Sequence, residues 1–365
     1  MSYKPGAMGI AEGTALALAI GITPVFLSIW SIVLERAATG AWLTPLITGS
    51  SLVAALFAIF HVMARVPGDL FAVVEALLGT FAARLVAVYL AGCFFTTAIL
   101  QLRQFAENTL LTSLPAVDIT LALGWFGLGA AAAVFAGIEP LARAARLVFP
   151  LGIFLWFTGL VALYDRFDIY NLMPWLGSGL PVARIGFETI GVFLGTFIIP
   201  ILAPSFQTVS TMKKAALAGI GLATALRSAS LFVYTGVFGV AVGQEKVLPF
   251  FELARLIYLN RFIQRVESFF ILFWVFAGMT MIAVNLYLAA FLLARLFALP
   301  TLRPLAVPLV VVAIHAALLI PDLTTAVEIS LIVEGRVQTL AVAAIPAVLL
   351  TALYLKNGGG RTARG

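Results

Sequence analysis

The tetrapeptide Gly21-Ile22-Thr23-Pro24 interrupts the first long apolar stretch, and this interruption most constrains the fold. Residues 8–34 contain one charged side chain, Glu12, and a stretch of this length crosses a bilayer. Inside lipid every backbone N–H and C=O needs a partner, so a helix break persists only where protein or a cavity replaces the lost hydrogen bonds. Thr23 is a good N-cap, and Pro24 suits the first position of a helix. The sequence therefore predicts two half-helices, the second of which points the positive end of its dipole at the membrane midplane.

The composition places the whole chain in the membrane class. Of the 365 residues, 62% are hydrophobic and 10% are charged, whereas soluble domains carry roughly 25% charged residues. The apolar runs are continuous rather than alternating, which predicts helices and not a membrane barrel. The net charge of +6 comes from basic residues scattered between these runs. Such scatter is typical of an orientation signal and does not indicate nucleic-acid binding.

About ten transmembrane helices are expected, in two sets of five. The first repeat covers about 9–164 and the second about 185–356 of one transporter-like domain, residues 1–356. The expected spans are 9–34, 42–63, 82–110, 119–138, 146–164, 185–206, 214–243, 266–298, 303–321 and 336–356. An odd number of spans inverts the second set, so a 5+5 inverted repeat is predicted. Residues 357–365 have no apolar face and are expected to form a disordered tail.

The charges between the spans predict the orientation. The loops on the side of the N-terminus hold most of the Lys and Arg residues, whereas most acids lie in the opposite loops, including Asp165, Asp168, Glu245 and Glu334. The positive-inside rule then places both termini in the cytoplasm.

The sixth span repeats the interruption of the first, since it contains Gly191, Gly195, Thr196, Pro200 and Pro204. Matched interruptions in the first helix of each half indicate a binding site at the midplane. Half-helix N-termini attract a carboxylate and C-termini an ammonium group, so a zwitterion such as a free amino acid fits both. The alternative is that Gly and Pro are common in membrane helices and that the two glycines form a G-x-x-x-G packing face.

Other side chains could contact the same ligand. Phe193 could cover it, and hydroxyl or amide contacts could come from Thr96, Thr97, Thr280 and Asn285. The alternative for each threonine is a hydrogen bond to its own helix backbone.

The expected spans lack a central acid. Glu12 lies at the inner end of the first span and Glu188 at the outer end of the sixth, and no Lys lies in the middle of a span. An active transporter often carries such a residue for coupling. The pattern therefore favours a sensor or a facilitator over a concentrative pump.

Two groups of charges lie near the outer ends of spans. Arg103 and Glu107 are four residues apart and can pair on one helix face, if only as an ordinary helix-end ion pair. Glu252 lies in the run Pro249–Arg255, which Arg265 and Glu267 follow. Charges mixed with Phe and Leu predict an interfacial helix over the outer mouth, and an ordinary amphipathic loop helix is the alternative.

Neither metal binding nor catalysis is indicated. His61 and His315 lack the spacing of metal ligands. No Ser or Cys is accompanied by the paired His and acid that hydrolysis needs. We therefore expect no enzyme activity and no cofactor.

Several short motifs, in order along nearly the whole chain, carry a family resemblance. They are Leu102-Arg103-Gln104-Phe105-Ala106-Glu107, Gly137-Ile138-Glu139 with Ala142-Arg143, Asn171-Leu172-Met173-Pro174 with Gly177 and Gly179, Pro249 to Leu253, and Arg265-Val266-Glu267 leading to Trp274. In these segments the chain resembles the spore germination receptor B-subunit (GerAB) family of the amino acid–polyamine–organocation superfamily.

The resemblance implies a leucine-transporter-type fold whose first and sixth helices are broken. It also implies sensing of a germinant, typically an amino acid, in the inner membrane of a spore. The implied partners are an A-type membrane subunit and a C-type lipoprotein subunit, and germinant binding triggers ion release through the complex. An amino acid or polyamine permease of the same fold, and a structural membrane scaffold with a vestigial site, are the alternatives.

Overall fold

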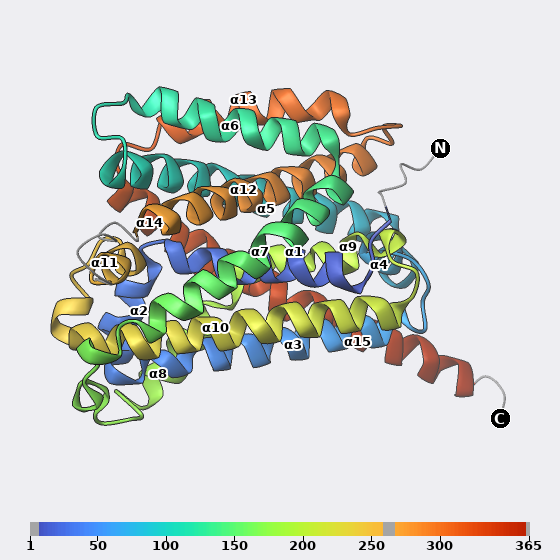
Figure 1. The fold of residues 1–365 in the computed structure, drawn as a ribbon. Coiled ribbons are helices and arrows are strands. Elements are labelled where there is room, and N and C mark those ends of the chain that lie inside the picture. Colours follow the sequence, from blue (N-terminus) through green and yellow to red (C-terminus); the bar gives the residue numbers. More distant parts are fainter. Residues whose placement is uncertain (1–6, 258–266, 363–365) are drawn as a thin grey trace.

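The computed structural model describes residues 7–257 and 267–362, which form a bundle of helices (Figure 1). Within these ranges the only β-pairing is an isolated parallel bridge between Met8 and Phe206. Eight helical runs are long and apolar enough to cross a membrane, and two shorter apolar helices, Ile10–Phe26 and Arg303–Leu318, accompany them. Together they account for the ten expected spans.

The first half of the bundle contains the earlier five segments. They are α1 (Ile10–Ile22) with η1 (Thr23–Phe26), then α2 (Ile29–Ala37), η2 (Ala38–Leu43) and α3 (Thr44–Met63), then α5 (Thr80–Thr112), α6 (Ile119–Ala136) and α7 (Ile138–Val161). A short helix, α4 (Leu70–Leu78), precedes α5, and the turns η3 (Tyr164–Arg166) and η4 (Ile169–Leu172) follow α7.

The second half begins with another interrupted segment. This segment comprises α8 (Leu180–Glu188), η5 (Ile190–Phe197), α9 (Ile198–Ile201) and η6 (Ala203–Ser205). The elements that follow it are α10 (Val209–Gly243), α11 (Pro249–Arg255), α12 (Glu267–Leu296), α13 (Arg303–Leu318), α14 (Leu323–Ile332), the π-helical η7 (Val333–Gln338) and α15 (Thr339–Thr362). Helix α15 thus extends six residues beyond the expected end of the last span, into the segment expected to be disordered.

The first interruption begins inside the predicted tetrapeptide, where α1 ends at Ile22, but it extends beyond Pro24. Gly21 belongs to α1, whereas the first extended residue is Leu27, and α2 starts only at Ile29. Thr23 does not cap the second half-helix, because its hydroxyl donates to the Ala19 carbonyl one turn back at 2.5 Å. The 3-10 turn η1 continues the backbone hydrogen bonds past Pro24. The break therefore extends towards the C-terminal end of the segment.

The second interruption is confirmed. Helix α8 ends at Glu188, and within η5 the backbone of Phe193 leaves helical geometry at φ −104° and ψ 15°. All eight residues of η5 are buried. A break in this position is surrounded by protein, as the hydrogen-bonding requirement of the bilayer demands.

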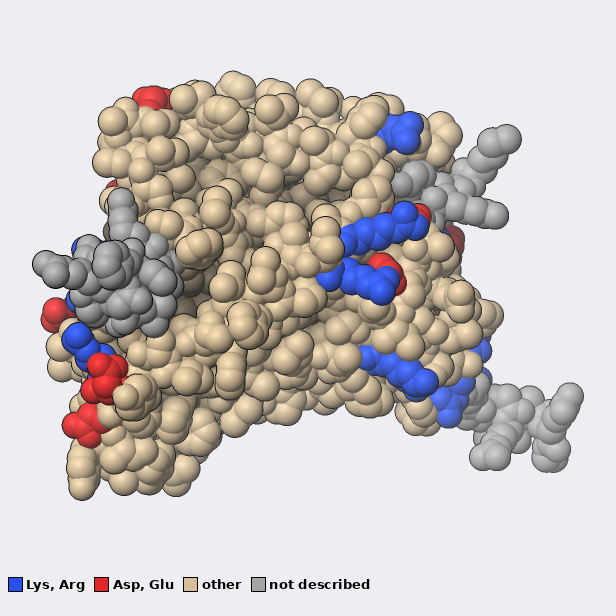
Figure 2. Space-filling view, viewed as in Figure 1, with Lys and Arg blue, Asp and Glu red and all other residues tan. Residues whose placement is uncertain are grey.

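The interrupted segments lie in the middle of the bundle. Figure 1 shows α1 and α9 between two layers, with α6 and α13 on one side and α3, α10 and α15 on the other. On the face seen in Figure 2, Lys, Arg, Asp and Glu gather towards the two ends, and a wide uncharged band separates them. Exposed apolar side chains such as Phe81, Leu147 and Leu319 are those a lipid environment accepts.

Candidate ligand site between the interrupted helices

A small closed cavity lies where the two interrupted segments meet. Its volume is about 10 Å³, and its lining comes from α1, α3, η5 and α10: Gly21, Thr48, Gly49, Leu52, Phe193, Thr196, Ile220, Ala223, Thr224 and Arg227. A space of this size holds about one water molecule. The cavity is thus too small for an amino acid, and in this sense we call the arrangement of the site closed.

Arg227 is the charged side chain of this cavity, and the sequence analysis missed it. It lies in the middle of α10 and is 4% exposed. Its guanidinium carbon is 3.6 Å from the centroid of the Phe193 ring and 5.2 Å from that of Trp30. An arginine in the centre of a long apolar run is a candidate for a functional site. The position of Arg227 inside the apolar run 214–243 carries that signal in the sequence.

Trp30 connects this arginine to the first interruption. Its indole N–H donates to the Pro24 carbonyl at 3.0 Å, which holds the ring across the break between η1 and α2. Phe193 is the non-helical residue of the second interruption. The Arg227 guanidinium thus contacts one aromatic ring from each interrupted segment.

Of the residues predicted at the first interruption, Gly21 alone lines the cavity. A Cβ atom on Gly21 would lie 2.6 Å from the Ala223 Cβ, so α1 and α10 approach closely here. Ile22, Thr23 and Pro24 are buried. They belong to the packing between helices rather than to the cavity wall.

The residues predicted at the second interruption divide between two places. Phe193 and Thr196 line the cavity, and the Thr196 hydroxyl donates to the Phe193 carbonyl at 2.8 Å. Gly195 lies beside α1, since a Cβ there would be 2.8 Å from Ile20. Gly191 packs against the backbone of η7 and donates its N–H to the Thr339 hydroxyl at 3.1 Å. Both glycines therefore permit close packing.

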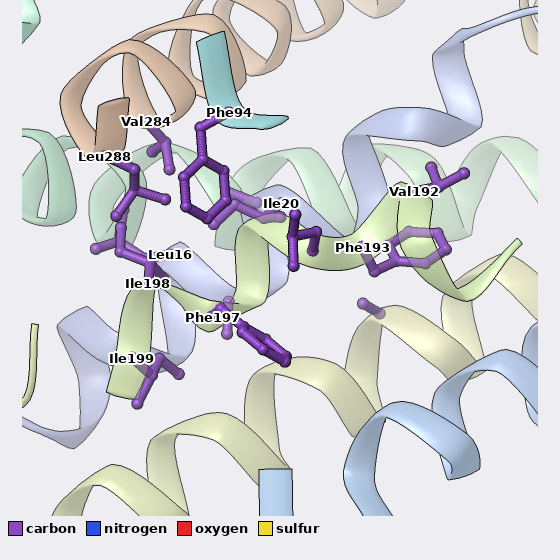
Figure 3. Close-up of a cluster of buried hydrophobic side chains, with 14 of the residues drawn as sticks. Leu16, Ile20, Phe94, Val192, Phe193, Phe197, Ile198, Ile199, Val284 and Leu288 are labelled. Atoms are coloured by element: carbon purple, nitrogen blue, oxygen red, sulfur yellow. The ribbon is translucent and has the colours of Figure 1, made fainter. Parts of the chain in front are cut away.

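Thr97 and Asn285 belong to a separate polar seam between α5, α12 and η7. The Gln338 amide donates to the Thr97 hydroxyl and to the Cys93 carbonyl, the latter at 3.3 Å. The Asn285 amide donates to Gln101 Oε1 at 3.1 Å. Ile20, Phe94 and Val284 form part of the apolar cluster beside this seam (Figure 3). The predicted polar residues thus do not form one site in the closed arrangement.

Of two other predicted hydroxyls, one is hydrogen-bonded to its own helix and the other is not part of the cavity wall. The Thr280 hydroxyl donates to the Phe276 carbonyl of its own helix at 2.8 Å, which is the alternative that the sequence left open. Thr96 is partly buried on α5 and does not line the cavity.

A buried acid lies in a helical run where the sequence predicts a loop. Glu334 was placed in an outer loop, but it lies in η7, within the apolar run Leu323–Lys356, and is 4% exposed. The π-helical turn η7 keeps the backbone of this run helical at the point where the lower hydropathy of the sequence predicts a loop. Ser330 and Gln338, four residues to either side, face α5, and Ser330 accepts a hydrogen bond from Gln104 at 2.9 Å. A missing carboxylate therefore no longer argues against ion coupling.

The predicted pair of Arg103 and Glu107 is confirmed, with 2.9 Å between the charged atoms. It also fastens the start of α14. Arg103 donates to the Pro321 carbonyl at 2.8 Å, and Glu107 Oε1 accepts from the Leu323 N–H at 3.1 Å. The Oε2 atom of Glu107 has no hydrogen-bond partner, so the contact is a close ion pair rather than an aligned hydrogen bond. The pair is more than a helix-end contact.

We expect Arg103→Met to lower the free energy of unfolding by about 2 kcal/mol, because it leaves a partly buried carboxylate and the Pro321 carbonyl without their partner. The matched control is Arg143→Met, whose pair with Glu139 is largely exposed and should be worth less than about 1 kcal/mol. Thermal unfolding of the purified protein in detergent measures both. Equal losses would show that the link to α14 adds nothing.

The other predicted outer charges are only partly described. Glu252 pairs with Arg255 at 3.5 Å on α11. Arg265 lies outside the described residues, and so does the side chain of Glu267. Their predicted role at the outer mouth stays a prediction.

A larger cavity lies beside α8 and reaches towards the site. Its volume is about 930 Å³, and its charged lining residues are Arg36, Arg184, Glu188, Glu328 and Arg336. It reaches Thr189 and Val192, next to Phe193 in sequence. The interrupted segment η5 therefore separates an open vestibule from the closed cavity around Arg227.

Comparisons with known proteins agree on family and fold. A family model described as spore germination protein matches residues 14–325. Spore germination protein YndE of Bacillus subtilis (strain 168) is 24% identical over 263 residues, covering 70% of this chain and 71% of that protein.

Among solved structures, MhsT in complex with L-phenylalanine superimposes with a TM-score of 0.65 at 15% identity, covering 97% of this chain and 99% of that one. A Na⁺-coupled sialic acid symporter in a substrate-bound outward-open state gives 0.65 at 12% identity, covering 96% of this chain and 80% of that one. This likeness shows the leucine-transporter-type fold.

Proposed function

Because this chain belongs to the spore germination protein family, we propose that it is the germinant-sensing B subunit of a spore germination receptor, with an amino acid as its ligand. The observation that carries the proposal is the closed cavity on which both interrupted helices converge. A ligand that fits only an opened form of this cavity shifts the equilibrium between the two arrangements. That shift is the signal passed to partner subunits.

The proposed setting is the inner membrane of a spore, with both termini in the cytoplasm. The excess of Lys and Arg at the loops on that side supports the orientation. The proposed partners are an A-type membrane subunit and a C-type lipoprotein subunit, through which ions are released. The solved structure with L-phenylalanine supports an amino acid as the kind of ligand that this fold accommodates.

An amino acid or polyamine permease is the second candidate. The buried Glu334 and the likeness to a Na⁺-coupled symporter favour it, because coupled transporters use carboxylates inside their spans. Uptake of a labelled amino acid into proteoliposomes that contain this chain alone distinguishes the candidates. Net uptake of the labelled amino acid would rule out a purely sensory role.

Gly21→Ala should reduce the response of spores to their amino acid germinant by about tenfold in concentration, because overpacking between α1 and α10 displaces the wall of the site. The added methyl would lie 2.6 Å from the Ala223 Cβ. The measurement is germination of spores whose only B subunit of this type is the variant.

The double variant Gly21→Ala with Ala223→Gly provides the control, since it removes the opposing methyl. It should restore most of the response. If Gly21→Ala alone germinates at the normal amino acid concentration, the ligand binds elsewhere.

A further inference from the structure

The buried charge of Arg227 is neither neutralised nor fully hydrogen-bonded in the closed structure. A guanidinium stays charged in proteins and carries five N–H donors in a planar fork. The Nε atom of Arg227 has no hydrogen-bond partner, and within the described residues no carboxylate pairs with its guanidinium. The Phe193 and Trp30 rings offer cation–π contacts but no acceptor oxygen. A charge in the middle of a span normally pairs with an opposite charge.

Two of the three threonine hydroxyls that line the cavity, those of Thr48 and Thr196, are already engaged. The Thr48 hydroxyl is within hydrogen-bond distance of the Thr44 and Gly186 carbonyls, and the Thr196 hydroxyl donates to the Phe193 carbonyl. Gly21 and Gly49 contribute no side chain. Arg227 is therefore the lining residue with a charged fork of donors to offer, and such a fork matches the two oxygens of a carboxylate.

The ring that covers Arg227 belongs to the residue at which the interrupted segment η5 is not helical. Phe193 lies directly on the guanidinium and is the residue at which η5 leaves helical geometry. In Figure 3 Phe193 lies on the side of Ile20 away from Phe94, near Val192. Its neighbour Val192 lines the open vestibule. An anion that enters from the vestibule can thus replace the ring on the guanidinium only if η5 shifts.

From these observations we propose that Arg227 binds the carboxylate of the ligand, so that the site selects small carboxylate-bearing molecules over neutral ones. This inference rests on the proposed function. Arrival of the carboxylate exchanges a cation–π contact for a charge-assisted, two-point ion pair and moves Phe193 with η5. Binding of the carboxylate and the shift of η5 then occur in one step.

The test uses the full-length protein in lipid nanodiscs and measures the ligand-induced shift in Tm. Each of the twenty amino acids is tested alone, and each one that shifts Tm is compared with its amide, which keeps the side chain and amine but lacks the carboxylate. We expect the free amino acid to act and the amide to be weaker by about tenfold or more. Arg227→Gln should abolish the preference, whereas Arg227→Lys, which keeps the charge, should retain part of it.

The control variant is Arg84→Gln, which removes the same charge from an exposed position on α5 and should leave the preference unchanged. The ligand-free Tm of Arg227→Gln should equal or exceed that of the wild type, because an unpaired buried charge is removed. A clear fall in that Tm would assign Arg227 a structural role and overturn the inference.

The remaining outcomes separate this inference from the proposed function. If amides bind as well as free amino acids, or if Arg227→Gln keeps the preference, a ligand site remains but Arg227 is not its anchor. If no amino acid shifts the Tm of the wild-type protein, the amino acid part of the proposed function falls together with the inference.

Discussion

Gly191→Ala is expected to lower the free energy of unfolding by about 3 kcal/mol or more, at the upper end of what overpacking causes. The added Cβ would lie 1.9 Å from the Glu334 carbonyl oxygen and 2.5 Å from the Thr339 nitrogen. Both are backbone atoms, one in η7 and one at the start of α15, so neither can move away by rotation of a side chain. Thermal unfolding of the purified protein in detergent measures the loss.

The matched control is Gly92→Ala on α5, where an added Cβ meets no atom within 4 Å. This change should be neutral or stabilising by up to about 1 kcal/mol, since Ala is the better helix former. Similar Tm values for the two variants would show that η5 and η7 are not packed backbone to backbone.

The second large effect is expected for Asp69→Ala, which should cost about 3 to 5 kcal/mol, as breaking a buried ion pair does. The Asp69 side chain is 4% exposed and pairs with Arg295 of α12. It also caps α4, accepting from the Ala72 N–H at 2.8 Å. One carboxylate therefore fastens a short helix to a long span at the end of the bundle where α1 begins.

Two further variants separate the contributions of Asp69. Asp69→Asn keeps a good cap but loses the ion pair, so it should show most of the loss. Asp118 caps α6 through the Thr120 N–H at 2.8 Å and is exposed, so Asp118→Ala should have a small effect. Unfolding in detergent gives all three values. A loss for Asp118→Ala as large as that for Asp69→Ala would rule out the pair with Arg295 as the cause.

Much of the architecture was predictable from local patterns. The lengths of the apolar runs gave ten spans, because a bilayer sets the length of a crossing helix. Gly191, Gly195 and Pro200 indicated the second interruption, and the four-residue spacing of Arg103 and Glu107 predicted their ion pair. Each of these features depends on residues that are close in the sequence.

The details of the site were less predictable, for physical reasons. Thr23 and Pro24 suit a helix start, but the Thr23 hydroxyl donates to the Ala19 carbonyl of the preceding turn. The backbone becomes extended only at Leu27. Glu334 looked like a loop residue because a π-helical turn cannot be read from hydropathy.

The sequence was sufficient to predict a helical membrane protein of about ten spans, two of them interrupted, since apolar length and helix-breaking residues are local properties. Only the tertiary structure decided which side chains meet. It placed Arg227 of α10 between Phe193 and Trp30, from segments far apart in the chain, and it separated Thr97 and Asn285 from that cavity. The physical reason is that a buried polar group takes whichever partner the packing of helices brings within reach, and no spacing along the chain encodes that distance.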